Sequence, residues 1–267
     1  MKVAAIDFDG TLHHESGISA ADVAALRAWR DAGHVAMCAT GRSRNELKRG
    51  LSGTGAAFDF HVLSNGSAAT THDDELLFSH AVPHHVVAEA VDRFGDTPGL
   101  AICGTTWGTV DGIFAENTQG AEGYELIAGF STMTPADIPH HTFAVLVFWV
   151  PGSTGSTDAP AHVSGEVISW IDSLNVNGPV VDYARNADFI DVMAPGRSKG
   201  VGLTDVFSHS GWQRSEIELY TFGDSWNDMS MHTMADISHS FRHSPADVRG
   251  ATDHVIESVG EALQNYL

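Results

Sequence analysis

Basic residues are scarce in this chain. It contains 14 lysines and arginines against 34 aspartates and glutamates, which gives a formal net charge of −20 at pH 7. Nucleic acids and anionic membranes bind proteins through basic patches, and so acidic a surface repels both. We therefore expect neither a nucleic acid nor a membrane among its partners. An anionic substrate would need a local cluster of positive charge, set against the field of the whole protein.

Cysteines and long apolar runs are scarce as well. The two cysteines, Cys38 and Cys103, have neither the number nor the spacing of a disulfide framework or a metal site. The longest uninterrupted apolar run, residues 143–150, is too short to cross a bilayer. Asp7 interrupts the apolar stretch that follows Lys2, so no secretory signal is visible. These features predict a protein of the reducing cytoplasm.

Strands and helices are expected to alternate at both ends of the chain. Its 267 residues, 43% of them hydrophobic, suffice for one large domain or for a domain with an insert. One helix is expected from Ser19, where Asp22 completes a capping box, to Gly33. The alternation predicts an α/β fold with a doubly wound, parallel-sheet (Rossmann-like) core. The expected core strands are residues 3–8, 35–40, 60–64, 219–223 and 254–256.

The middle of the chain has a different pattern. Two helical stretches occur there among four strand-like ones, and a loop rich in Gly, Ser and Thr is expected at 151–157. We interpret residues 83–184 as an α+β unit inserted into a core that consists of residues 1–82 and 185–267. The expected helices of the insert are 84–94 and 160–174, and its expected strands are 100–103, 109–114, 143–150 and 178–184.

The most informative stretch is Ile-Asp-Phe-Asp-Gly-Thr-Leu at residues 6–12. Side chains alternate along a strand, so Asp7 and Asp9 start on the same side, where the buried run ends. Two like charges so close repel each other unless a cation or a shared proton is present. The pair therefore indicates a metal, a proton-transfer role, or both.

Polar groups also follow the other expected strands. Ligands of open α/β sheets bind outside the carboxyl ends of the strands, so we expect these groups to share one edge. Carboxylates there would suit Mg²⁺, which takes oxygen ligands, while hydroxyl, amide and ammonium groups would suit the oxygens of a phosphoryl group. The groups are Thr40, Gly41 and Arg42 after the second strand, Asn65 and Gly66 after the third, Lys199 at the start of a helix, and Asp224 and Asp228 after a late strand.

Together these stretches resemble a known family. DFDGT at 7–11, ATGRS at 39–43, SKG at 198–200 and GDSWND at 223–228 are similar, in kind and order, to the four motifs of the haloacid dehalogenase superfamily. The last motif resembles that of its Cof-type branch of sugar and small-metabolite phosphatases, which carry a large cap between the second and third motifs. The resemblance implies that segment 83–184 is a cap domain. It also implies a hydrolase whose partner is a small phosphorylated metabolite.

The resemblance further implies roles in the chemistry. Asp7 would be the nucleophile that forms an aspartyl-phosphate. Asp9 would protonate the leaving oxygen and later deprotonate the attacking water. Thr40 and Lys199 would bind phosphate oxygens, with help from the Gly41 amide.

The metal and the substrate would engage the remaining residues. The resemblance implies that the carboxylates of Asp7 and Asp224 and the main-chain carbonyl of Asp9 hold Mg²⁺. It implies that Asp228 orients Lys199 or a water bound to the metal. The residues expected beside the substrate are Arg42, Asn65, Gly66 and Asn227.

The residues alone leave several alternatives open. Arg42 is as compatible with a structural ion pair as with a substrate contact, and Trp226 is expected to pack in the core. His13 and His14 follow the first motif closely enough to face the substrate.

A phosphomutase or phosphotransferase could use the same aspartyl-phosphate, and a non-catalytic protein could sense a phosphorylated ligand. The pair of aspartates disfavours the sensor, because binding requires neither an acid nor a base.

The expected cap is poor in positive charge. Residues 83–181 contain one basic residue, Arg93, and eleven acidic ones. Such a segment offers little to pair with a second phosphate or a carboxylate on the leaving group, although core arginines could reach in. The same acids could instead solvate the outer face. We expect a sugar or polyol monophosphate to be preferred over nucleotides and bisphosphates.

Overall fold

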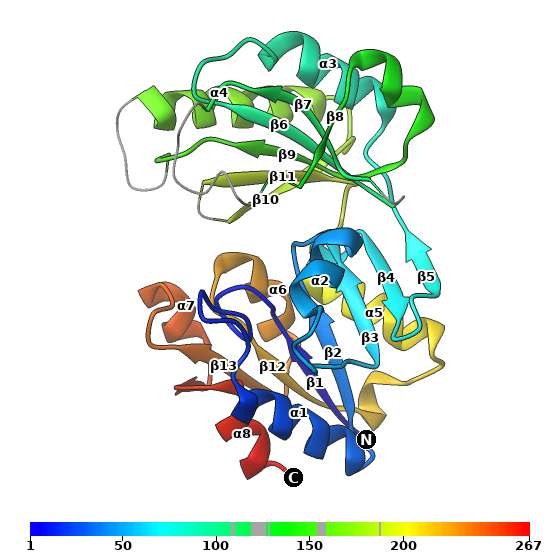
Figure 1. Cartoon of the computed structure of the whole chain (residues 1–267), viewed down its shortest axis with the longest axis vertical. Coiled ribbons are helices and arrows are strands. Elements are labelled where there is room, and N and C mark those ends of the chain that lie inside the picture. The colour runs from blue at the N-terminus through cyan, green and yellow to red at the C-terminus, as the bar shows by residue number, and fades with distance from the viewer. Residues whose placement is uncertain (108–109, 119–126, 128, 154–158, 187) are drawn as a thin grey trace. The chain divides into compact units, whose positions relative to one another are not determined.

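The computed structural model of the chain describes residues 1–107, 110–118, 127, 129–153, 159–186 and 188–267. The chain forms two compact units (Figure 1). The core unit comprises Met1–Phe78 and Ser198–Leu267, and the inserted unit comprises Ser79–Arg197. None of the described helices combines the length and the apolar character that a membrane span requires.

The core unit is built on one sheet with helices around it. The strands are β1 (Lys2–Ile6), β2 (Val35–Ala39), β3 (Phe60–Leu63), β4 (Ala68–Thr71), β5 (Leu76–Ser79), β12 (Glu218–Phe222), β13 (Ile237–Phe241) and β14 (His254–Ile256). The α-helices are α1 (Ala20–Asp31), α2 (Arg44–Leu51), α5 (Lys199–His209), α6 (Met229–His232), α7 (Ala246–Ala251) and α8 (Val259–Asn265). Short 3₁₀ turns include η1 (Ser64–Gly66), η4 (Arg214–Glu216) and η5 (Trp226–Asp228).

The strand order of this sheet is β14-β13-β12-β1-β2-β3-β4-β5. All pairings from β14 to β3 are parallel, and β4 runs antiparallel to β3. The chain moves outward from β1 through β2 to β3, and later returns to the other side of β1 at β12 before it moves outward to β14. The carboxyl ends of β1 and β12 therefore flank the switch point at which doubly wound sheets bind their ligands.

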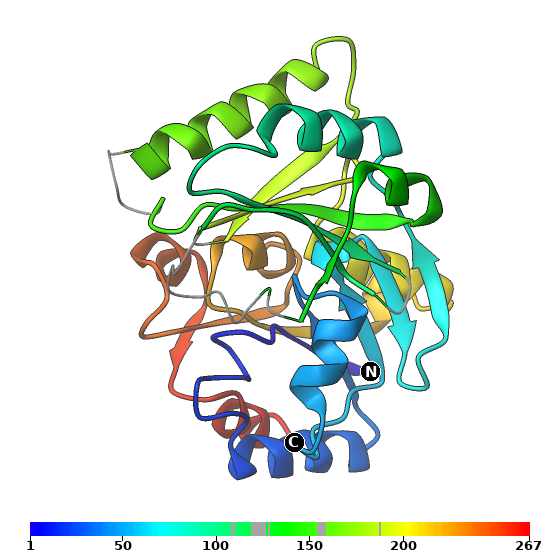
Figure 2. The same cartoon turned by 45° about the horizontal axis from the view of Figure 1, so that its top comes forward.

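Helices cover both faces of the core sheet, as Figure 2 shows from a second side. Leu203 and Val206 of α5 share an apolar cluster with Leu219 of β12. On the other face, the ring of Trp29 in α1 lies 5.6 Å from that of Tyr220, the next residue of β12. Neighbouring residues of a strand point to opposite faces, so α1 and α5 lie on opposite sides of the sheet.

The inserted unit is an α+β structure with its own apolar core. Its six-stranded sheet has the order β10-β11-β9-β6-β7-β8. Residues of both long helices, among them Val87 and Trp170, share an apolar cluster with Leu146 and Phe148 of β9, so the helices pack on one face of this sheet. The elements are α3 (His84–Phe94), β6 (Ala101–Thr106), β7 (Gly112–Glu116), β8 (Ser131–Thr132), η3 (Pro135–His140), β9 (Phe143–Trp149), α4 (Ala159–Leu174), β10 (Asp182–Asn186) and β11 (Phe189–Met193).

The inserted unit extends further than the expected segment 83–184. The strand β10 pairs with β11, and β11 pairs with β9, so the chain returns to the core unit only after β11. The structure also contains β13 and the pair β4 and β5, which the sequence did not predict. Residue 109 of the strand expected at 109–114, and residues 154–157 of the expected loop, lie outside the described residues.

Candidate active site

Asp7 stands at the carboxyl end of the central strand. The preceding residues of β1, from Val3 to Ile6, have no exposed surface, because strands flank β1 on both sides and helices cover both faces. The backbone N–H of Asp7 donates to the carbonyl of Phe222 at 2.8 Å, which extends the pairing with β12 beyond the strand. Asp7 itself is only 5% exposed. A carboxylate so deeply buried requires a partner.

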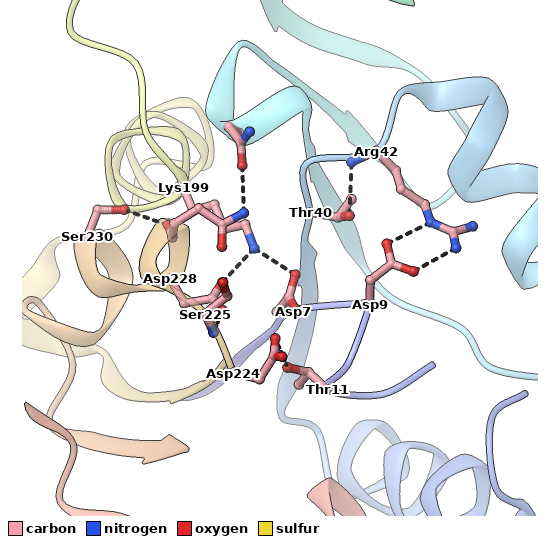
Figure 3. A network of polar contacts seen from close by, with 12 residues as sticks. Asp7, Asp9, Thr11, Thr40, Arg42, Lys199, Asp224, Ser225, Asp228 and Ser230 are labelled. Atoms are coloured by element: carbon pink, nitrogen blue, oxygen red, sulfur yellow. Dashed lines mark hydrogen bonds and ion pairs between the residues drawn. The ribbon is translucent and has the colours of Figure 1, made fainter. Parts of the chain in front are cut away.

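Lys199 is that partner. Its Nζ lies 2.6 Å from Oδ1 of Asp7 and 2.5 Å from Oδ1 of Asp228 (Figure 3). Lys199 is the first residue of α5, after the N-cap Ser198, and is 1% exposed. Burial by itself would lower the pKa of Lys199, but the charges of Asp228 and Asp7 outweigh it and raise that pKa above its ordinary value. The ammonium therefore remains charged between the two carboxylates.

Asp224 adds a third carboxylate to this cluster. Oxygens of Asp7, Asp224 and Asp228 lie within 4.8 Å of one another. Burial and the nearby charge of Asp228 raise the pKa of Asp7 and of Asp224, while Lys199 acts in the opposite direction. Two of the three carboxylates bond the Lys199 ammonium and the third lies beside them, so the cluster has an excess of negative charge.

Gly10 allows Asp224 to approach the first motif. This glycine has a φ of +77°, and a Cβ placed on it would lie 2.5 Å from Oδ2 of Asp224. The hydroxyl of Thr11 is 3.4 Å from Oδ1 of the same carboxylate. The Gly-Thr pair that follows the two aspartates thus brings the ends of β1 and β12 into contact.

Asp9 lies apart from the cluster and pairs with Arg42. The Nε and Nη2 of Arg42 donate to the two carboxylate oxygens of Asp9 at 2.8 and 2.6 Å (Figure 3). The guanidinium also lies over the ring of Phe8, with its Cζ 4.7 Å from the ring centroid. The side chain of Asp9 is 47% exposed. Of the two roles weighed for Arg42, the structure shows the ion pair.

Thr40 and Gly41 present hydrogen-bond donors after β2. Thr40 is buried, and its Oγ1 accepts the backbone N–H of Arg42 at 3.1 Å, which leaves the hydroxyl proton to donate elsewhere. The N–H of Gly41 has no acceptor among the residues that the structure describes. Two donors at one turn form a cradle for an anionic oxygen.

Asn65 and Gly66 form a left-handed turn after β3 that packs against the start of α5. Their φ angles are +52° and +87°. A Cβ on Gly66 would lie 2.0 Å from the carbonyl oxygen of Ser198, so the close packing beside Lys199 requires glycine. The side-chain oxygen of Asn65 accepts a hydrogen bond from Nδ2 of Asn227 at 3.2 Å. The third-strand turn and the last motif are thereby joined.

Trp226 differs from its expectation. It is 46% exposed, and its Nε1 donates to Oδ2 of Asp247 at 2.9 Å, so the expectation that it packs in the core is wrong. The physical reason is its place on η5, a short turn at the surface between the strand β12 and the helix α6.

Histidines surround the first motif. Nδ1 of His13 lies 3.9 Å from Oδ1 of Asp9, and the ring of His14 meets that of His243 edge-on at 6.2 Å. The sequence did not single out His243, whose Nε2 is 2.8 Å from the carbonyl oxygen of Gly10. Its position after β13 was the available signal, but that strand was not predicted.

The acidic cluster fits a divalent cation. Asp7, Asp224 and Asp228 together carry three negative charges when ionised, and Lys199 offsets one of them. A bound dication would offset the remaining two and would favour the ionised form of Asp7. The three members of the cluster offer carboxylate oxygens, which favours Mg²⁺ over softer metals.

Comparison with known families agrees with this geometry. A sequence model of haloacid dehalogenase-like hydrolases matches residues 4–262. The chain belongs to this family. The resemblance stated from the four motifs is thereby confirmed, as is the expectation of a hydrolase. A comparison with curated protein sequences finds no match.

Solved structures of this superfamily share the fold. A haloacid dehalogenase-like hydrolase from B. subtilis aligns over 100% of both chains, with a TM-score of 0.80 and 16% identity. A phosphatase of the superfamily from Bacteroides thetaiotaomicron aligns over 100% of this chain and 95% of its own, with a TM-score of 0.78 and 19% identity. A subclass IIB sugar phosphatase aligns over 100% and 99%, with a TM-score of 0.76 and 20% identity. These likenesses confirm the predicted fold class.

Proposed function

We propose that this hydrolase is a Mg²⁺-dependent phosphatase that cleaves a phosphomonoester of a small metabolite. The observation that carries the proposal is that the two aspartates of the first motif pair with different cations. Asp7 is buried against Lys199, and Asp9 is exposed against Arg42. A nucleophile needs a fixed position beside positive charge, whereas an acid and base must lose and regain a proton at the reacting atoms.

In the first half of the reaction, the carboxylate of Asp7 attacks the phosphorus. The bond between phosphorus and the leaving oxygen breaks, and protonated Asp9 gives its proton to that oxygen. The products are an alcohol and an aspartyl-phosphate on Asp7. Covalent catalysis of this kind divides one difficult displacement into two easier ones.

In the second half, a water molecule attacks the phosphorus of the aspartyl-phosphate. Asp9, now ionised, takes a proton from that water, and the bond between phosphorus and the Asp7 oxygen breaks. Inorganic phosphate leaves, Asp7 is again a carboxylate and Asp9 is again protonated. The cycle consumes one water and needs no other co-reactant.

Three donors are placed to hold the oxygens of the phosphoryl group. They are the hydroxyl of Thr40, the N–H of Gly41 and the ammonium of Lys199. Donors fixed in advance stabilise charge that develops in the transition state. Oδ1 of Asp228 accepts from Lys199 and its Oδ2 accepts from the N–H of Ser225 at 2.9 Å, so Asp228 positions the lysine.

The residues that would hold Mg²⁺ are Asp7, Asp224 and the main-chain carbonyl of Asp9. When bound, the ion would supply positive charge to the phosphoryl oxygens and to the crowded carboxylates. Asn65, Gly66 and Asn227 lie around the same edge and complete the substrate side of the site. Arg42 serves this site through Asp9.

A sugar or polyol monophosphate is the substrate class that we favour. The inserted unit carries little positive charge with which to bind a second anionic group, since Ser79–Arg197 hold three basic residues, Arg93, Arg185 and Arg197, against 14 acidic ones. A protein of similar fold is a sugar phosphatase, which supports the same class.

The test is release of inorganic phosphate from a panel of sugar and polyol monophosphates, nucleotides and bisphosphates at one ionic strength. We expect the highest kcat/KM for a sugar or polyol monophosphate. A nucleotide or bisphosphate preferred by about tenfold or more, equal to about 1.4 kcal/mol, would contradict the substrate class. Phosphate that appears on a second sugar, with none released, would instead identify a phosphotransferase.

A further inference from the structure

A pocket lies in the core unit, away from the acidic cluster. It has a volume of about 410 Å³ and is formed by α2, the loop that follows it, β3 and β4. None of the residues assigned to catalysis, phosphate or metal lines it. Pockets that bind small molecules have volumes of roughly 300–1,000 Å³, so this one is large enough for a compact ligand.

The inner wall of the pocket is apolar. Leu47 of α2, Phe58 of the loop and Leu63 of β3 line it and are at most 3% exposed. Leu51 and Ala56 continue this wall toward the opening. Such a surface favours an apolar group over water, at about 25 cal/mol for each Å² removed from solvent.

The outer wall has more hydrogen-bond donors than free acceptors. Asp74 is the one carboxylate that lines the pocket, and both of its oxygens accept bonds from Arg44. Lys48 donates to the same carboxylate at 2.5 Å, and its other two N–H groups have no partner among the described residues. Arg44 and Lys48 thus meet at one carboxylate, and Lys48 keeps two N–H donors for a ligand.

The polar rim is also held in place. Asp74 has a φ of +69°, in the left-handed region, and its N–H donates to the carbonyl of Thr71 at 3.0 Å. The hydrogen bond from Arg44, together with Lys48, lowers the pKa of Asp74, so it stays ionised and paired at neutral pH. A rim fixed in this way binds a ligand with little loss of conformational entropy.

Basic residues are concentrated in and just before α2, which is unusual for this chain. Four of its 14 basic residues, Arg42, Arg44, Lys48 and Arg49, fall within residues 42–49, which contain a single acidic residue, Glu46. Of these four, Arg44 and Lys48 line the pocket, whereas Arg42 pairs with Asp9 and Arg49 lies outside the lining.

We propose that this pocket binds a small amphipathic anion: a compact apolar body against Leu47, Phe58 and Leu63, with its carboxylate on Lys48. The site is distinct from the catalytic cluster, and its occupancy can be measured without reference to the reaction. A failure of the proposed phosphatase activity would therefore leave this proposal untouched, and the converse also holds.

The experiment is a titration of the full-length ¹⁵N-labelled protein, followed by amide chemical shifts. The probes are hexanoate, hexanol and inorganic phosphate, each at the same ionic strength. We expect saturable shifts of the pocket residues with hexanoate, weaker ones with hexanol and none with phosphate. Hexanol that binds as tightly as hexanoate would overturn the role of the charge. Phosphate that binds as tightly would overturn the role of the apolar wall.

Two matched variants separate this site from general electrostatics. Lys48→Glu and Arg49→Glu make the same change of charge on neighbouring exposed residues of α2, but only Lys48 lines the pocket. Lys48→Glu should weaken hexanoate binding by about tenfold or more, the effect of one hydrogen bond to a charged group, and Arg49→Glu by far less. Equal losses of hexanoate affinity in the two variants would overturn the proposal.

Ala56→Phe fills the pocket and should remove hexanoate binding in a protein of unchanged thermal stability. Retained binding in that variant would also overturn the proposal.

Discussion

The guanidinium of Arg42 holds the carboxylate of Asp9 by two hydrogen bonds, of 2.8 and 2.6 Å, across 33 positions of sequence. Two residues before Asp9, Asp7 is held by Lys199 in a buried ion pair. The two aspartates of one short motif therefore belong to different electrostatic environments. This division supports the proposal that the buried carboxylate attacks and the exposed one transfers the proton.

Replacement of Asp9 tests the second of these roles. Asp9→Asn should lower kcat by about 10²–10⁴, the usual contribution of general acid–base catalysis, while Mg²⁺ affinity stays near that of wild type. The metal should remain because its proposed ligand at this position is the main-chain carbonyl. Phosphate release and Mg²⁺ titration measure the two quantities. Activity within a factor of two of wild type would contradict the assignment.

Removal of Lys199 should destabilise the core unit. Lys199→Met leaves Asp7 and Asp228 buried without their cation, which costs about 3–5 kcal/mol in the free energy of unfolding. Urea denaturation would measure the loss. The double variant Lys199→Met/Asp228→Asn removes one of the stranded charges and should recover part of it. A double variant that loses as much unfolding free energy as Lys199→Met and Asp228→Asn lose in sum would argue against the buried triad.

We expect the activity to depend on a divalent metal, because of the acidic cluster. Removal of divalent ions should abolish phosphate release, and Mg²⁺ should restore it better than Ca²⁺. The reason is geometric, because Mg²⁺ requires a compact octahedron whereas Ca²⁺ accepts longer and more numerous bonds that would misplace Asp7. Full activity in excess chelator would rule out the proposed role of the ion.

The motifs at the strand ends are the part of the site that sequence reasoning reaches best. Asp7 and Asp224 each follow a short apolar strand, and parallel strands place their carboxyl ends at one edge. The sequence leaves the role of Arg42 undecided between an ion pair and a substrate contact, because an arginine's long side chain can reach a protein carboxylate or a substrate equally well. Only the fold shows that the ends of β1 and β2 bring the two together.

Other features lacked a usable pattern. The strand β13 has the sequence Ile-Ser-His-Ser-Phe, and its Ser238, His239 and Ser240 are buried although they are polar. A search for apolar runs therefore misses it. The strand β11 falls within the segment 185–267 that the sequence pattern assigns to the core, but it pairs with β10 and β9 of the inserted unit. Pairing over such a distance leaves no local trace in the sequence.

His239 gives the core unit a defined response to acid. It is fully buried, stacks on Phe222 and lies 2.9 Å from the hydroxyl of Tyr266, and burial lowers its pKa to about 4. Between about pH 6.5 and 4 the unfolded state binds the extra proton, so the free energy of unfolding falls as the pH drops through this window. The full effect is about 3 kcal/mol.

Urea denaturation at several pH values measures this response. His239→Phe should reduce the slope of unfolding free energy against pH between about 6.5 and 4, because one of the titrating groups is gone. His72→Phe, at an exposed histidine of the same unit, is the matched control and should keep the wild-type slope. An unchanged slope in His239→Phe would show that other groups cause the response.

The central claim is that Asp7 becomes phosphorylated during turnover. The most direct measurement is a rapid acid quench of enzyme, Mg²⁺ and a substrate found in the panel, followed by mass spectrometry of the peptide that contains Asp7. We predict one phosphoryl group on Asp7, removed by mild base, at the time when alcohol has been released but phosphate has not. Asp7→Asn should show neither this adduct nor turnover, while Asp73→Asn, at an exposed aspartate, should show both. Turnover by Asp7→Asn at a rate near that of wild type, or a phosphoryl group found on another residue, would contradict the account.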